Sequence, residues 1–155
     1  MINIYTDGAS SGNPGPGGFG VILHSGKHYK EISEGYRKTT NNRMELLAVI
    51  TGLESIKNPG QEIMIYSDSK YIIDSVEKKW VFNWVRTNFK DKKNKDLWLR
   101  FLEVYKQHKI RFTWVKGHNG HPENERCDEL AVQASKQKNL LIDTYFEKED
   151  LKLNL

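Results

Sequence analysis

Alternating apolar and polar residues predict five β-strands in this chain. In the first of them, Ile2 and Ile4 alternate with more polar neighbours, and we expect this strand to end at Asp7. A segment rich in glycine and proline, residues 7–20, follows and predicts a loop. The expected strands are residues 2–6, 19–24, 29–36, 62–68 and 110–115.

Helical spacing of the apolar residues predicts four helices between and after these strands. Asn42 followed by Glu45 is typical of a helix N-terminus, and Asp96 is a second expected cap. Pro122 suits the first turn of the last helix. The expected helices are residues 42–56, 69–79, 96–108 and 122–138.

The order of these elements predicts an α/β fold. Early strands joined by tight turns pair antiparallel, whereas strands separated by a helix need a parallel crossover. We therefore expect a five-stranded mixed sheet, with three antiparallel strands and then parallel strands, flanked by helices. Residues 1–140 are expected to form one domain, and the tail 141–155 receives no role. In such sheets, sites form at the carboxyl ends of the parallel strands.

The composition fits a single globular domain. The 155 residues are 37% hydrophobic and 28% charged, which allows a buried core. The single cysteine, Cys127, excludes an internal disulfide. No apolar run approaches the roughly 20 residues of a membrane helix, and the N-terminal residues carry no export signal. We expect a cytoplasmic monomer with no obligate protein partner.

Positive charge is concentrated in one stretch of a chain whose formal net charge is +4. Residues 78–95, called the basic segment below, hold seven basic side chains and a single acid, Asp91. The aromatic side chains of Trp80, Phe82, Trp84 and Phe89 lie among them. This patch indicates contact with a polyanion such as nucleic acid. A run of charge that is merely solvated is the alternative, and the sequence leaves it open.

Four acidic residues stand where a carboxylate has chemical consequences. Asp7 and Asp68 are each expected to end a strand, so pairing of those strands would bring the two together. Glu45 and Asp128 share helix faces with small apolar residues that face the sheet. Alone, each acid is explained by a cap, a salt bridge or, for Asp7 before Gly8, a turn. Together they indicate a site for Mg²⁺ or Mn²⁺, with two ions suiting phosphodiester hydrolysis.

Two further motifs have more than one interpretation. His118 lies in a loop bracketed by glycines, and an imidazole there suits proton transfer near neutral pH. The alternatives are a surface histidine or a zinc ligand with His121 and Cys127, which lacks a fourth partner. The glycines of residues 15–20 match a dinucleotide-binding pattern, but they precede a strand rather than a helix, so that interpretation fails.

Five segments resemble the motifs of the ribonuclease H type 1 family in its single-domain bacterial form. They are YTDGAS at 5–10, NPGPGG at 13–18, TNNRMEL at 40–46, YSDSKY at 66–71 and WVKGHNGHPENERCD at 114–128. The resemblance covers residues 1–140 in the family's order and spacing. It implies hydrolysis of the RNA strand of an RNA–DNA hybrid, leaving 5′-phosphate and 3′-hydroxyl ends.

The resemblance also implies roles for individual residues. Asp7, Glu45, Asp68 and Asp128 match the metal-binding acids, with two Mg²⁺ ions, or Mn²⁺, per site, and His118 matches a mobile proton shuttle. The implied substrate contacts are Ser10, Asn13, Thr40, Asn41, Asn42, Lys70, Lys78, Lys79, Trp80, Trp84, Arg86 and Lys90. The asparagines match contacts to the minor groove and its 2′-hydroxyls, and Thr40 matches a contact to a phosphate of the DNA strand.

The chain departs from the family pattern at Lys70, and two rival functions remain open. Lys70 stands where many relatives have Gln, which favours a phosphate contact over a base or sugar contact. We expect Trp80 and Trp84 to hold the basic segment in shape while its cations contact phosphates, and we expect no separate hybrid-binding domain before Met1. The rivals are a nuclease of the junction-resolvase type and a hybrid-binding module without catalysis. Loss of an acid would favour the module, and all four are present.

Overall fold

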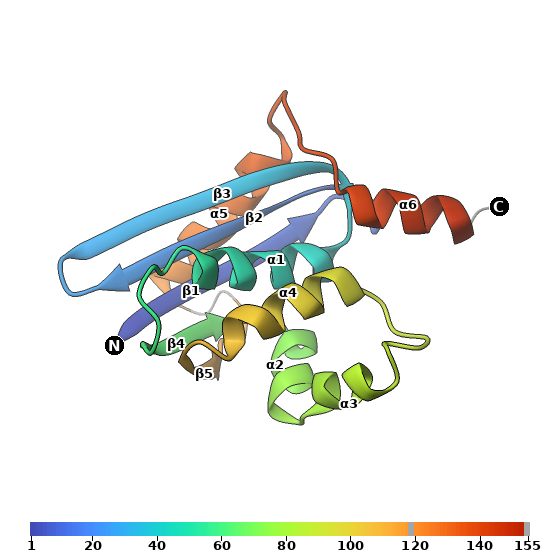
Figure 1. Cartoon of the computed structure of the whole chain (residues 1–155). Coiled ribbons are helices and arrows are strands. Elements are labelled where there is room, and N and C mark those ends of the chain that lie inside the picture. Colours follow the sequence, from blue (N-terminus) through green and yellow to red (C-terminus); the bar gives the residue numbers. More distant parts are fainter. Residues whose placement is uncertain (118–119, 154–155) are drawn as a thin grey trace.

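The computed structural model describes residues 1–117 and 120–153 and contains one five-stranded mixed sheet. The strand order is β3-β2-β1-β4-β5 (Figure 1). β1–β2 and β2–β3 pair antiparallel, whereas β1–β4 and β4–β5 pair parallel, which confirms the predicted fold class. The strands are β1 (Ile2–Ser10), β2 (Gly15–Ser25), β3 (His28–Thr39), β4 (Glu62–Ser67) and β5 (Lys109–Trp114).

Helices cover both faces of this sheet (Figure 1). α1 packs on one face with α4 outside it, and α5 packs on the other face against β1, β2 and β3. Of the helices in the described ranges, none is both long and apolar enough to cross a lipid bilayer. The helices are α1 (Asn41–Glu54), α2 (Lys70–Glu77), α3 (Trp80–Arg86), α4 (Lys95–Tyr105), α5 (Pro122–Ser135) and α6 (Thr144–Leu153).

The first two strands are longer than predicted. Asp7 lies inside β1 rather than at its end, and only residues 11–14 of the expected loop separate β1 from β2. The glycines that predict a loop lie mostly in β2, where they serve close packing and not a turn. A Cβ at Gly20 would lie 2.3 Å from the carbonyl oxygen of Cys127, so this bare stretch of β2 lets α5 pack close to the sheet.

Three expectations about the helices are wrong in detail. Thr40, not Asn42, caps α1, because its hydroxyl accepts a hydrogen bond from the Arg43 amide at 3.3 Å. Asp96 does not cap α4, which follows Asn94, since its carboxylate binds Arg43 instead. The short helix α3 and the C-terminal helix α6 were not expected, because neither carries a clear apolar stripe.

A buried ion network ties α1 to distant parts of the chain. The Arg43 guanidinium, only 3% exposed, donates to Asp143 at 2.7 and 2.9 Å and to Asp96 at 2.8 and 2.7 Å. Thr39 also donates its hydroxyl proton to Asp143, at 2.7 Å. The network therefore joins the start of α1, the first turn of α4 and a residue of the segment beyond 140.

We expect the substitution Asp143→Asn to lower the free energy of unfolding by about 3 kcal/mol, since it breaks a buried ion pair. The matched control is Glu147→Gln, which removes an acid from the same segment. Glu147 pairs with Arg37 in an exposed bidentate contact, worth about 0–1 kcal/mol. Urea unfolding of both variants measures the difference, and equal losses would show that the network is no stronger than a surface pair.

Candidate active site

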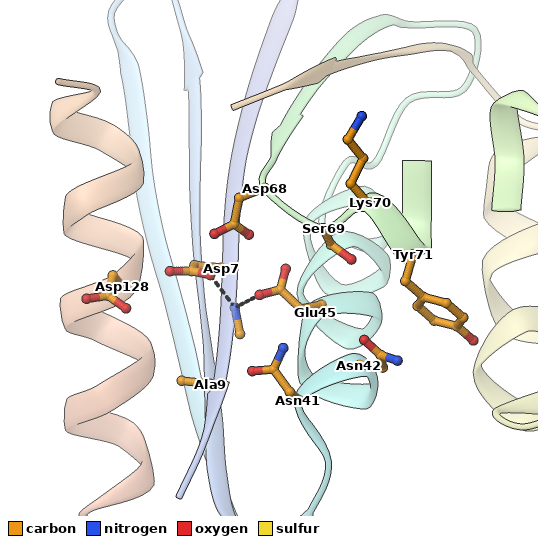
Figure 2. Close-up of a pocket in the computed structure, with 11 residues that line it drawn as sticks. Asp7, Ala9, Asn41, Asn42, Glu45, Asp68, Ser69, Lys70, Tyr71 and Asp128 are labelled. Carbon is orange, nitrogen blue, oxygen red and sulfur yellow. Dashed lines mark hydrogen bonds between the residues drawn. The ribbon is translucent and has the colours of Figure 1, made fainter. Parts of the chain in front are cut away.

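An open pocket of about 480 Å³ lies at the edge of the sheet where β1 and β4 run parallel. Its walls come from β1, the start of α1, the turn between β4 and α2, and α5 (Figure 2). The lining residues are Asp7, Gly8, Ala9, Asn41, Asn42, Glu45, Asp68, Ser69, Lys70, Tyr71 and Asp128. The pocket is thus at the topological position predicted for a site in a sheet of this kind.

Three of the four predicted acids meet in this pocket. Asp7, Glu45 and Asp68 each offer a carboxylate oxygen, and these oxygens lie within 4.8 Å of one another. The strand register explains the pair from the sheet, because Tyr5 lies beside Tyr66 and the two aspartates each follow two residues later. Asp7 reaches Asp68 although it does not end its strand, since β1 continues past the end of β4.

Gly8 holds Glu45 in this cluster. Its amide donates to Asp7 Oδ1 and to Glu45 Oε1, both at 2.9 Å (Figure 2). A Cβ at Gly8 would lie 2.4 Å from the Glu45 backbone nitrogen, so only glycine allows β1 and α1 to approach this closely. Gly8 is in a strand, so the alternative that Asp7 merely serves a turn is wrong.

The cluster is buried and its charges repel. Asp7 is 5% exposed and Glu45 is 3% exposed. Burial, together with the charges of Asp68 and Asp128, raises the pKa of Asp7 to about 7. Burial and then the neighbouring charges of Asp7 and Asp68 raise the pKa of Glu45 well above its ordinary range. At neutral pH this pair of carboxylates therefore destabilises the fold unless a proton or a cation compensates its negative charge.

Asp128 lines the same pocket from α5 but lies outside the group of three. In the view of Figure 2, Asp7 lies between Asp128 and Glu45, and the charge of Asp128 contributes to the raised pKa of Asp7. Because α5 packs closely on Gly20, the part of α5 that carries Cys127 and Asp128 lies next to β1. Asp128 is half-buried, less than expected for a residue facing the sheet.

The predicted substrate contacts separate into two groups around the pocket. Asn41, Asn42 and Lys70 line it. Asn13 lies beside it, because its Oδ1 accepts a hydrogen bond from the Asn41 amide at 3.2 Å. Thr40 caps α1, and Ser10 ends β1; neither is among the lining residues.

Ser69 and Tyr71 also line the pocket, and neither is among the residues predicted from the sequence. Ser69 caps α2, with its hydroxyl accepting from the Ile72 amide at 3.3 Å. The Tyr71 hydroxyl accepts hydrogen bonds from Asn94 at 3.1 Å and Trp98 at 2.8 Å. Their position directly after Asp68, at the start of a helix, was the available signal.

The basic segment stands apart from the pocket, and its aromatic residues differ in role. Trp84 packs edge-to-face against Phe89 and Trp98, with ring centroids 6.4 and 6.1 Å apart, so it anchors the segment as expected. Trp80 is 42% exposed, with Lys78 Nζ 5.3 Å from its ring centroid, and its expected part in holding the segment in shape stays a prediction. Six of the seven cations expected to contact phosphates are exposed, namely Lys78, Lys79, Arg86, Lys90, Lys92 and Lys93, whereas Lys95 is half-buried.

His118 lies outside the described residues, so its predicted role as a proton shuttle has no structural description. The zinc alternative finds no support in residues 1–117 and 120–153. There the only group of three or more candidate metal ligands is that of Asp7, Glu45 and Asp68. Cys127 is buried, and its thiol donates to the Tyr5 carbonyl at 3.2 Å.

Comparisons of the sequence with known proteins agree with one another. The RNase H family model matches residues 1–136. A ribonuclease H of Desulforamulus reducens is 54% identical over 148 residues, which cover 92% of both chains. A ribonuclease H of Trichodesmium erythraeum is 50% identical over 151 residues, covering 94% of this chain and 96% of that protein.

Solved structures give the same result. LC9-RNase H1, described as a type 1 RNase H with the type 2 active-site motif, superimposes with a TM-score of 0.77. It is 30% identical, and the match covers 95% of this chain and 79% of that one. LC11-RNase H1, solved in complex with an RNA/DNA hybrid, matches 86% of this chain and 96% of its own, with a TM-score of 0.63 and 25% identity.

The raised pKa of Asp7 predicts a pH-dependent cost in the metal-free protein. Its ordinary value is 3.8 and its folded value is about 7, so the folded state binds more protons and stability falls as pH rises between them. We expect Asp7→Asn to raise the thermal midpoint at pH 8 by roughly 2–4 °C for each kcal/mol of repulsion relieved, and much less at pH 5. Mg²⁺ should raise the midpoint of the unsubstituted protein more than that of Asp7→Asn.

Calorimetric or fluorescence melting at both pH values measures this effect. Glu62→Gln, which removes an exposed acid at the far end of β4 from Asp68, is the control for net charge. Equal changes of the thermal midpoint in Asp7→Asn and Glu62→Gln would contradict the conclusion that charge repulsion within the cluster destabilises the fold.

Proposed function

The chain belongs to the ribonuclease H family, and from this premise we propose that it hydrolyses the RNA strand of RNA–DNA hybrids at the pocket of Asp7, Glu45 and Asp68. The observation that carries the proposal is the grouping of three buried or half-buried carboxylates in a pocket at the carboxyl ends of the parallel strands. The hybrid bound by LC11-RNase H1 supports the choice of substrate. We further propose that it acts as a monomer.

The donor set fits hard divalent cations. Every candidate ligand is a carboxylate oxygen, which suits Mg²⁺ or Mn²⁺ rather than zinc or copper. Glu45 Oε2 is buried without a hydrogen-bond partner among the described residues, so this oxygen can serve as a metal ligand. We assign Asp7, Glu45, Asp68 and Asp128 as the residues that would hold two ions. Bound ions of this type lower the pKa of water and stabilise the charge of a phosphodiester undergoing attack.

The protein's own groups would orient the RNA strand for in-line displacement. Water attacks the phosphorus, the bond to the 3′-oxygen breaks, and the products carry 5′-phosphate and 3′-hydroxyl ends. We propose that Asn41 and Asn42, which line the pocket at the start of α1, contact the 2′-hydroxyls together with Asn13, which lies beside Asn41. The 2′-hydroxyl is what distinguishes RNA from DNA at a given site. His118 is proposed, from the sequence alone, to take up and release the proton.

A panel of three labelled duplexes tests the function and its rivals. With Mg²⁺ present, we expect cleavage of an RNA–DNA hybrid and no cleavage of duplex DNA or duplex RNA. Asp68→Asn should abolish cleavage and keep hybrid binding, because it removes a metal ligand while lowering the negative charge near a polyanion. Glu62→Gln, at the other end of β4, should cleave normally.

Each contrary result has a defined meaning. Cleavage of duplex DNA at a comparable rate would favour a nuclease of the junction-resolvase type. Binding of the hybrid without cleavage by the unsubstituted protein would favour a module without catalysis. Cleavage by Asp68→Asn at near the normal rate would remove this residue from the metal site.

The basic segment is proposed to contact phosphates away from the pocket. Lys90, Lys92 and Lys93 are exposed, and their joint replacement by Ala should raise KM and leave kcat nearly unchanged at saturation. The slope of log Kobs against log salt should flatten by up to about 2.7 units if all three contact phosphates, using the coefficient for B-DNA.

A matched triple variant controls for net charge. Lys27, Lys30 and Lys57 are equally exposed but lie at the opposite end of the sheet, and replacing them by Ala should leave the salt slope nearly unchanged. Equal changes in both triple variants would show that the basic segment is a solvated surface and not part of the binding site.

A further inference from the structure

Trp114 is an exposed aromatic residue beside the pocket that the proposed reaction does not use. It ends β5 and is 42% exposed. It is not among the lining residues. Its two polar contacts nevertheless both go to the turn that carries Asp68.

One contact is made by the edge of the indole and the other by its face. Nε1–H donates to the carbonyl oxygen of Asp68 at 3.3 Å. The Lys70 ammonium lies over the ring, with Nζ 4.0 Å from the centroid. This is the shortest of the cation–aromatic contacts found between described residues, and tryptophan is the best partner for such a contact.

The backbone next to these contacts is also fixed. Ser67 pairs with Trp114 in the register of β4 and β5, and its carbonyl accepts from the Val115 amide at 2.9 Å. The Ser67 hydroxyl accepts from the Ser69 amide at 3.0 Å. The end of β5 therefore determines the path of the chain from β4 into α2, where a metal-ligand candidate and a pocket cation lie two residues apart.

We propose that Trp114 is a positioning residue, whose ring holds the Lys70 ammonium at the pocket as a contact for a phosphate of the bound nucleic acid. The proposal rests on the function proposed above. A lysine side chain has four flexible bonds and loses much conformational freedom on binding. Contact with the ring restricts the ammonium before the substrate arrives, so less freedom is lost when the phosphate binds.

A double-mutant cycle tests the proposal through binding rather than turnover. Affinity for a labelled RNA–DNA hybrid is measured by fluorescence anisotropy in the Asp7→Asn background, which is expected not to cleave. Lys70→Met should weaken binding and flatten the salt slope by about one unit. Trp114→Leu should weaken binding about 2- to 5-fold. Once Lys70→Met is present, Trp114→Leu should have almost no further effect.

Conservative and matched variants complete the experiment. Trp114→Phe keeps an aromatic face for the lysine and should restore most of the affinity lost in Trp114→Leu. This comparison separates the contact with the ring from any loss of stability in Trp114→Leu. Trp80 has the same exposure and also carries a lysine over its ring, so Trp80→Leu should weaken binding by the same factor with or without Lys70→Met.

The results that overturn the proposal are distinct from those that overturn the function. If Trp114→Leu weakens binding equally in both Lys70 backgrounds, Trp114 contacts the hybrid itself or acts through the fold. Binding by Trp114→Phe as weak as that by Trp114→Leu would exclude the contact with the ring face. Absence of hybrid cleavage by the unsubstituted protein would instead remove the proposed function.

Discussion

Strand β1 and helix α1 approach each other so closely at Gly8 that a single added carbon would lie 2.4 Å from the backbone of Glu45. This approach buries two carboxylates, those of Asp7 and Glu45, around one backbone amide. Buried like charges are costly, and the raised pKa of Asp7 reflects that cost. The pocket is therefore a place where the fold is destabilised unless a cation or a proton is present, and the proposed chemistry uses that feature.

The surrounding structure maintains this arrangement from three sides. The bare backbone at Gly20 lets α5 lie against β2, which brings Asp128 to the pocket. Arg43, which directly follows the asparagines at the start of α1, is held by carboxylates from α4 and from beyond residue 140. Trp114 fixes the turn after β4. Each of these contacts joins two segments that are remote in sequence.

Much of the fold and the site could be predicted because the relevant signals are local. Alternation and helical spacing predicted the order of the five strands and of α1, α2, α4 and α5, although not α3 or α6. The parallel pairing of β1 and β4 placed Asp7 beside Asp68. The resemblance to type 1 ribonucleases H is confirmed by the family-model match and the structural neighbours. The glycines of β2 resemble a loop in the sequence, but they are required because α5 packs closely against them. This helix lies more than 100 residues further along the chain, so no local pattern reveals the contact. Asp143 gave no signal, since its partner Arg43 is equally distant in sequence.

The most direct test of this account is the titration of the pocket carboxylates, observed by ¹³C NMR of the side-chain carboxyl groups. In the metal-free protein, we expect Asp7 and Glu45 to titrate as a coupled pair, with the pKa of Asp7 near 7 and the pKa of Glu45 well above its ordinary range. Saturating Mg²⁺ should move that titration several units lower, because a bound cation favours the ionised form. Ordinary titration of both groups near pH 4 without metal, unchanged by Mg²⁺, would contradict the account.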